Sequence, residues 1–134
     1  MLGKEIFVGY SKISVDENNT LTMPTFARAN AGDRYVLIPE NNDIAIYSMS
    51  TIKSYYDKVE SLPTKDRLYF AKEMRKMCDA IIEDIVVDDN HQIHLSSDIN
   101  VVNNIVEFVG SGDRVLMSGE FEFNNELTRN KKQA

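Results

Sequence analysis

The sequence predicts a mainly β fold with helices, of the α+β class, built from two β-β-α-β-β units with a helical hairpin between them. One observation is a repeat: V-D-E-N-N-T-L-T-M at Val15–Met23 recurs 72 residues later as V-D-D-N-H-Q-I-H-L at Val87–Leu95. Each copy has β-forming residues on both sides of a polar, turn-prone centre, which is the pattern of a β-hairpin. The other observation is helical periodicity between the copies. We therefore interpret the chain as an internal duplication.

The composition is that of an ordinary soluble globular protein. The chain has 134 residues, of which 43% are apolar and 27% charged, so it can form one compact domain with its own core. Its single cysteine, Cys78, excludes an intramolecular disulfide and indicates a reducing compartment. No window approaches the ~20 consecutive apolar residues needed to span a bilayer. We therefore expect a cytoplasmic protein without a membrane partner.

The first repeat is expected over residues 1–48. Its predicted elements are a strand region, a turn, a strand, a short helix and two further strands, at Ile6–Val15, Glu17–Thr20, Leu21–Met23, Thr25–Ala31, Tyr35–Ile38 and Ile44–Tyr47. Asn18 and Asn19 can form the tight turn without glycine because asparagine tolerates positive φ. Pro24 ends the strand ladder because it donates no N–H, and Gly32 closes the short helix.

Residues 49–80 are predicted to form two helices packed as a hairpin. The apolar residues fall at helical spacing in two stripes that are separated by Pro63 and Thr64, namely Ile52, Tyr55, Tyr56, Val59 and Leu62, then Phe70, Met74, Met77 and Ile81. Basic residues occupy the opposite face of the second helix: Lys65, Arg67, Lys72, Arg75 and Lys76. We interpret this basic face as a solvated surface.

The second repeat is expected over residues 81–123, followed by a flexible tail at 124–134. Its strands are predicted at Ile85–Val87, Ile93–Leu95, Ile105–Val109 and Val115–Met117, with a turn at Asp88–Gln92 and an added edge strand at Phe121–Phe123. Ser97–Asn104 takes the place of the short helix. A strand-for-strand alignment of the two repeats pairs Val36 with Val106 and Asp43 with Asp113.

Charge is distributed unequally between the repeats. The formal net charge is −6, which disfavours wholesale coating of nucleic acid. Residues 1–48 carry −2 and residues 49–80 carry +2, whereas residues 81–123 carry −8 with Arg114 as their single base. The second repeat is therefore a poor surface for phosphate, and its carboxylates form either a solvated rim or a docking face for a basic partner.

Taken together, these residues resemble the MraZ family of bacterial DNA-binding transcriptional regulators. The likeness covers roughly residues 6–117 and is carried by the twin V-D hairpins, the helical pair between them, Met23-Pro24 and V-G-S-G-D-R at Val109–Arg114. The resemblance implies tandem AbrB-like swapped-hairpin domains that close into one pseudo-twofold barrel. It also implies self-association into a homo-oligomer such as a ring, and hairpin surfaces that face double-stranded DNA near the nucleoid.

The same resemblance implies where DNA would be contacted. Family members carry Gly-Arg in each hairpin turn, and the matching pairs here are Asn19-Thr20 and His91-Gln92, so both arginines are replaced by uncharged residues. We therefore expect polar contacts of low affinity that are sensitive to salt. The predicted DNA-binding residues are Lys12, Asn18, Asn19, Thr20, Arg28, His91 and Gln92. The alternative is a degenerate relative that has lost DNA and acts as a protein-binding or scaffold module.

Enzymatic and metal-binding functions find no support in the motifs. The sequence has no nucleophile elbow, P-loop or dinucleotide fingerprint, so no catalytic residue and no cofactor are predicted. His91 and His94 would point to opposite faces of a hairpin, which is poor geometry for a metal. Cys78 is expected to be a buried, inert thiol within an apolar helix stripe.

Overall fold

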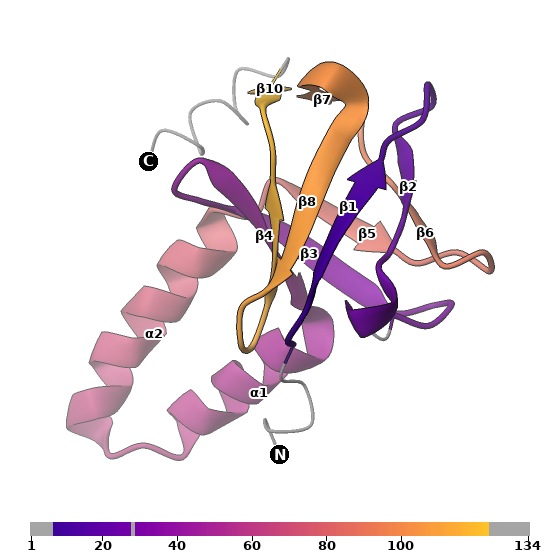
Figure 1. Ribbon diagram of the computed structural model, residues 1–134. Coiled ribbons are helices and arrows are strands. Elements are labelled where there is room, and N and C mark those ends of the chain that lie inside the picture. Colours follow the sequence, from indigo (N-terminus) through magenta and orange to yellow (C-terminus); the bar gives the residue numbers. More distant parts are fainter. Residues whose placement is uncertain (1–6, 28, 124–134) are drawn as a thin grey trace.

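The computed structural model describes residues 7–27 and 29–123, and they form a mixed α+β fold, as predicted (Figure 1). The strands are β1 Tyr10–Ser14, β2 Thr20–Thr22, β3 Arg34–Glu40, β4 Asp43–Ser48, β5 Glu83–Val86, β6 Gln92–His94, β7 Ile99–Val101, β8 Ile105–Gly110, β9 Val115–Ser118 and β10 Phe121–Phe123. The helices are α1 Met49–Glu60 and α2 Thr64–Asp79, with short 3-10 helices at Thr25–Ala27 and Val102–Asn104. The tail at 124–134, predicted to be flexible, lies outside the described residues.

Six of the strands form one antiparallel sheet, in the order β1-β8-β9-β4-β3-β5. Two further antiparallel pairs, β2 with β6 and β7 with β10, lie outside this sheet. The centre of the sheet is the pairing of β4 with β9, in which Ala45 lies opposite Leu116. In the large sheet, strands from before and after the helical hairpin are therefore interleaved.

The strand pairings of the first half recur in the second half. Ile13 of β1 pairs with Val106 of β8, and Ile85 of β5 pairs with Tyr35 of β3. The 72-residue repeat places Ile85 at the position of Ile13. The partner of Ile85, Tyr35, therefore corresponds to the partner of Ile13, Val106, so the predicted alignment of Val36 with Val106 is wrong by one residue. The connection from hairpin to strand is one residue longer in the first half, and a shift of one residue reverses the face of every side chain.

The same shift applies to the next strands. Ile44 pairs with Met117 and Ile46 pairs with Val115. When the two repeats are exchanged, β4 takes the place of β9, and this register then makes Ile44 equivalent to Val115. Asp43 therefore corresponds to Arg114 and not, as predicted, to Asp113.

One large apolar core lies between the sheet and the two outer strand pairs. Its largest fully buried side chains include Leu37, Ile46, Ile93, Phe108 and Met117, contributed by β3, β4, β6, β8 and β9. A second, smaller cluster lies on the other face of the sheet, where Val36 and Ile38 of β3 meet Ile52 of α1. Full burial of a side chain of this size stabilises a fold by about 1.5–3 kcal/mol, so the large core dominates the stability.

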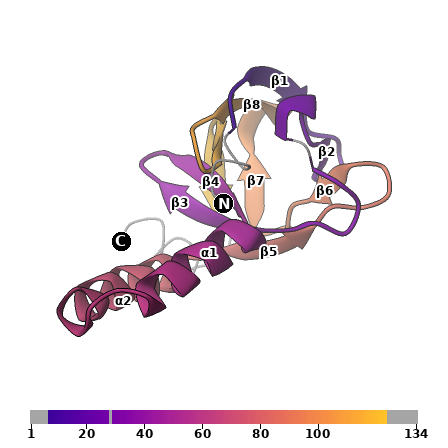
Figure 2. The ribbon, with the colours of Figure 1, turned by 90° about the horizontal axis from the view of Figure 1, so that it is seen from below.

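The helical hairpin is anchored at one end and projects away from the sheet (Figures 1 and 2). The Ser48 hydroxyl caps α1 by accepting a 3.1 Å hydrogen bond from the N–H of Thr51. In α1 only Thr51 and Ile52 are buried, and α2 has no buried residue. The predicted helices are present, but the second apolar stripe covers the protein only partly: Met74 and Met77 are half-buried and Phe70 is 45% exposed.

Two predicted helical segments are shorter or different in kind. In the described part of Thr25–Ala31, which excludes residue 28, the structure has one 3-10 turn, at Thr25–Ala27. Over Ser97–Asn104 it has strand β7, which pairs with β10, and then a 3-10 turn whose Asn103 adopts a φ of 68°. Alternating burial of Ile99 and Val101 against β10 favours the strand.

None of the helices in the described part of the chain is long and apolar enough to cross a bilayer.

Candidate nucleic-acid interface

Each of the two hairpin turns is held by one aspartate side chain. In the first turn, Asp16 Oδ1 accepts hydrogen bonds from the N–H groups of Asn18 and Thr20, both at 2.9 Å. In the second, Asp88 Oδ1 accepts bonds from the N–H groups two and four residues later, at 2.8 and 3.0 Å. Such aspartate-to-backbone bonds are a strong local determinant of turns. The V-D motif therefore fixes the same turn geometry twice.

The residue at the tip of each turn adopts a left-handed conformation. Asn19 has a φ of 62° and His91 a φ of 60°, and each donates its N–H to the carbonyl of its turn aspartate, at 3.0 and 3.1 Å. Asparagine and histidine are both among the non-glycine residues that are enriched in this region. These are the positions at which the sequence resemblance implied glycine.

The return strands of the two hairpins, β2 and β6, pair with each other in an antiparallel ribbon. Leu21 lies opposite Ile93. At the ends of the ribbon, Met23 N–H donates to the His91 carbonyl and Leu95 N–H donates to the Asn19 carbonyl, both at 2.9 Å. Each hairpin tip is thus hydrogen-bonded to the far end of the other hairpin's return strand. The ribbon lies on the side of the molecule away from the helical hairpin (Figures 1 and 2).

Two of the predicted DNA-binding residues use their polar atoms inside the protein. The Asn19 amide donates to the carbonyls of Ser96 and Ile99, at 2.9 and 2.7 Å, and so joins the first turn to Ser96 and to the first residue of β7. Thr20 is 7% exposed, and its hydroxyl lies 2.8 Å from Nδ1 of His94. Both side chains therefore have structural partners.

His94 connects the two hairpins, a role that the sequence did not indicate. Its Nδ1 faces Thr20 in the first hairpin, while its Nε2 lies 2.8 Å from Oδ2 of Asp88 in the second. The hydrogen bond with His94 is the largest cause that holds the pKa of the Asp88 carboxyl below its usual value, and the Gln92 N–H adds to the effect. The missed signal was the alternation of Gln92 and His94 on one strand, which places both on the face opposite buried Ile93.

The remaining predicted contacts are more accessible. Lys12 on β1 and Asn18 in the first turn are exposed, and Gln92 is half-buried at the start of β6. The exposed His91 has its Nδ1 3.0 Å from the carbonyl oxygen of Ala29. Arg28 lies outside the described residues. The predicted set is thus divided between exposed groups and groups engaged within the fold.

The electrostatic character of the turns is acidic. Glu17 and Asp89 are exposed beside Asp16 and Asp88, the aspartates that hold the turns. These carboxylates repel phosphate unless cations offset them. The exposed amine of Lys12 lies on the strand that leads into the first turn. Any anionic partner at this surface therefore depends on polar hydrogen bonds more than on net charge.

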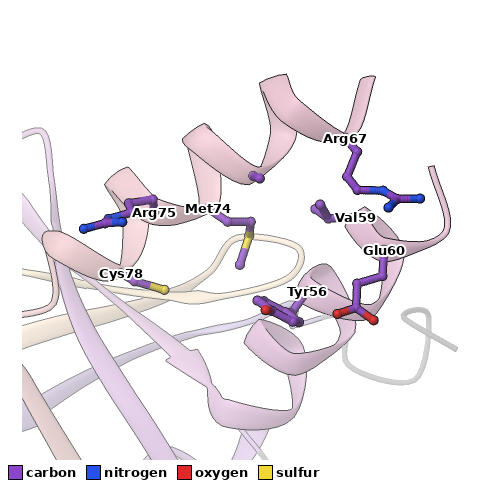
Figure 3. A pocket seen from close by; sticks show the side chains of 8 residues that line it. Tyr56, Val59, Glu60, Arg67, Met74, Arg75 and Cys78 are labelled. Atoms are coloured by element: carbon purple, nitrogen blue, oxygen red, sulfur yellow. The ribbon is translucent and has the colours of Figure 1, made fainter. Parts of the chain in front are cut away.

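A groove of about 620 Å³ lies between α1 and α2 (Figure 3). Tyr56, Val59 and Met74 contribute apolar surface to it, and Arg67 and Arg75 carry charge at its edges. Cys78 also lines the groove and is exposed, so the prediction of a buried thiol is wrong. The reason is that α2 packs against the protein along one side only.

A charged cluster near the sheet is structural in character. Arg114 donates to both carboxylate oxygens of Glu40, at 2.8 and 2.5 Å, and to Asp113 at 3.1 Å. Its guanidinium lies 5.9 Å from the ring centroid of half-buried Tyr47, and burial raises the pKa of that phenol to about 12. This network ties the β3–β4 turn to the β8–β9 turn.

Among the described residues, no group of three or more histidine, cysteine, aspartate or glutamate side chains is arranged to hold a metal ion. Comparison of the chain with models of known protein families and with curated proteins found no match.

Proposed function

We propose that this protein is a MraZ-like transcriptional regulator that binds double-stranded DNA through its hairpin turns and acts as a homo-oligomer. The observation that carries the proposal is the crossed pairing of β2 with β6, in which Leu21 lies opposite Ile93. A swapped pair of hairpins from two related halves is what the resemblance of the sequence to that family implies. The recurrence of the β1–β8 pairing as β5–β3 supports a pseudo-twofold barrel of the same kind.

The turn conformations support the same proposal. Asn19 and His91 occupy left-handed positions where the family resemblance implies glycine, so the turns keep the geometry although the residues differ. The following residues, Thr20 and Gln92, stand where that resemblance implies arginine. Because Thr20 is buried and Gln92 is partly accessible, the second turn is better placed to offer a side chain to DNA.

In this proposal the contacts are few and polar. Lys12 steers the first hairpin toward phosphate, while Asn18 and Gln92 donate to phosphate or base edges, and a glutamine amide can pair with an adenine edge. We expect weak binding because the turn carboxylates oppose it. The logarithm of the association constant should fall with the logarithm of salt concentration, with a shallow slope set by the small number of cations.

The test is a titration of a labelled genomic fragment pool by fluorescence anisotropy, at about 50 mM and about 200 mM salt. Saturable binding that weakens with salt is the expected result. Gln92→Arg should tighten it, whereas Gln92→Met, of similar length and uncharged, should not. An absence of binding by the wild type at tens of micromolar protein in low salt would reject the DNA proposal.

The second candidate function is a protein-binding or scaffold module on the same fold. The observation in its favour is that Asn19 and Thr20 are engaged inside the protein while Glu17 and Asp89 are exposed. A Gln92→Arg variant that binds DNA when the wild type does not would favour this candidate, because the turn would then be correctly placed but lack the charge.

A further inference from the structure

Helix α2 presents a basic stripe with two large apolar residues. Spacings of three, four and seven residues place its members on one helical face. Leu68 is 63% exposed and Tyr69 is 60% exposed, and α2 buries no residue in this chain. We call this face the helix stripe: Lys65, Leu68, Tyr69, Lys72 and Lys76. The Lys76 amine lies 3.3 Å from a carboxylate oxygen of Glu73, so Lys65 and Lys72 carry most of its positive charge. Exposed leucine and tyrosine among lysines favour a partner that is both apolar and acidic, which describes a protein surface better than bare phosphate.

The outer face of β8 has the complementary character. Its residues alternate, so that Val106 and Phe108 point into the core while the others face outward. Ile105 is 42% exposed and Val109 is 38% exposed. Together with Glu107 on the same strand and the exposed Glu120, which follows β9, they form what we call the strand strip: Ile105, Glu107, Val109 and Glu120. The Glu107 carboxylate accepts a 2.7 Å hydrogen bond from the Tyr10 hydroxyl.

The strand strip belongs to the most acidic part of the chain. Residues 81–123 carry a net charge of −8. The one arginine among them, Arg114, is bound to Glu40 and Asp113. Lys12 lies opposite Glu107 across the β1–β8 pair and offsets part of the charge. The surplus of negative charge is therefore not neutralised within residues 81–123.

We infer that the helix stripe of one copy of this protein docks on the strand strip of a second copy. Charge complementarity identifies the occupant: the stripe carries three lysines, and the strip carries the two carboxylates of Glu107 and Glu120. The segments around them have the same signs, +2 for residues 49–80 and −8 for residues 81–123. The apolar residues at the middle of each surface would supply the desolvated centre of the contact. This inference rests on the self-association in the proposed function and does not depend on DNA binding.

The two surfaces cannot meet within one chain, because α2 lies apart from β1 and β8 in both views of the molecule (Figures 1 and 2). The contact therefore uses different surfaces on the two copies. A contact of this heterologous type continues from copy to copy and gives either a closed ring or an open chain. Each copy would use its stripe once and its strip once.

The experiment is sedimentation velocity on the full-length chain at several protein and salt concentrations. The wild type should associate reversibly, and added salt should weaken the association. Leu68→Asp in the stripe and Val109→Asp in the strip should each weaken association by at least about tenfold, as expected for central contact residues. Matched controls are Tyr56→Asp on α1 and Val86→Asp on β5, which replace exposed apolar residues outside both surfaces.

A mixture of the two disabled variants gives the decisive result. Leu68→Asp keeps an intact strip and Val109→Asp keeps an intact stripe, so an equimolar mixture should form one heterodimer and nothing larger. Glu120→Lys replaces Val109→Asp if that variant melts early in circular dichroism, because Glu120 is exposed between strands and its charge reversal should also weaken association.

Three outcomes overturn the inference. A monomeric wild type means that a second copy does not cover these surfaces, and it also removes the self-association part of the proposed function. An assembling wild type that tolerates both substitutions leaves that part intact and places the interface elsewhere. Loss of DNA binding in Lys65→Glu and Lys72→Glu variants, without any change in assembly, assigns the stripe to DNA.

Discussion

Replacing the two left-handed turn residues by glycine should have unequal effects on stability, although their backbones are alike. For an L-residue the left-handed region costs about 1–2 kcal/mol, somewhat less for asparagine, and glycine removes that cost while adding entropy to the unfolded chain. At His91, with a φ of 60°, the side chain makes one exposed contact, to the Ala29 carbonyl. We expect His91→Gly to change the free energy of unfolding by less than about 0.5 kcal/mol, in either direction.

Asn19→Gly differs because the amide that it removes is engaged. Its two shorter hydrogen bonds, 2.9 Å to Ser96 and 2.7 Å to Ile99, are worth about 1–3 kcal/mol together. Two partly buried carbonyls would lose their donor, and the relief of backbone strain offsets only part of this loss. We expect a net destabilisation of about 1–2 kcal/mol, which corresponds to a lowering of Tm by roughly 3–8 °C for a chain of this size.

Thermal and urea denaturation followed by circular dichroism would measure both variants. Asn41→Gly is the control, because Asn41 is exposed in the β3–β4 turn with a φ of 56° and reports the effect of glycine at positive φ away from the hairpins. Equal loss of stability in Asn19→Gly and His91→Gly would refute the reasoning. It would mean that the backbone, and not the asparagine amide, decides the stability of the turns.

Three further predictions concern other parts of the fold. Gly110→Ala should lower Tm markedly in a melting experiment, because a Cβ at position 110 would lie 2.6 Å from the backbone carbonyl carbon of Phe7. An unchanged Tm would show that the backbone at Phe7, before β1, moves aside freely. Arg114→Lys should cost ~1 kcal/mol in urea unfolding, because lysine cannot reproduce the two parallel hydrogen bonds of Arg114 to the Glu40 carboxylate; a Lys variant as stable as the wild type would contradict this. Asp88→Asn should be less stable than wild type at neutral pH. The hydrogen bond with His94 lowers the pKa of the Asp88 carboxyl, so this carboxyl binds a proton less readily in the folded than in the unfolded protein. The greater stability of the wild type over Asp88→Asn should therefore disappear as the pH falls through and below the usual carboxyl pKa of 3.8. An advantage that persists at lower pH would show that another group is responsible.

The local elements were predictable because their causes lie within a few residues. Asp16 and Asp88 form their turns through bonds to N–H groups two and four residues away, so a V-D repeat in the sequence indicates two like turns. Ser48 starts α1 through a hydroxyl three residues before the N–H that it caps. Such short-range determinants hold wherever the segment lies in the fold.

What could not be predicted depends on long-range packing. Strand β7 is only three residues long, and Ile99 and Val101 become a strand because β10 pairs with them. The shift between Val36 and Tyr35 follows from a one-residue difference in a connection whose path only the packed core determines. The exposure of Cys78 follows from how little of α2 the protein covers, which the helical periodicity of the sequence does not reveal.

The turns also explain why the inference about fold and the inference about DNA must be tested separately. The bonds that set their shape come from Asp16 and Asp88 at the start of each turn, so the tip residues can change without loss of the geometry. In this chain the tip residues have other partners: Asn19 holds the first residue of β7, and His91 contacts the chain before β3. The crossed ribbon therefore requires the aspartates, whereas contact with DNA requires cations that these tips lack. The Gln92→Arg variant supplies a cation for DNA and leaves Asp16 and Asp88, which set the turn geometry, unchanged. It therefore tests DNA binding without altering the fold.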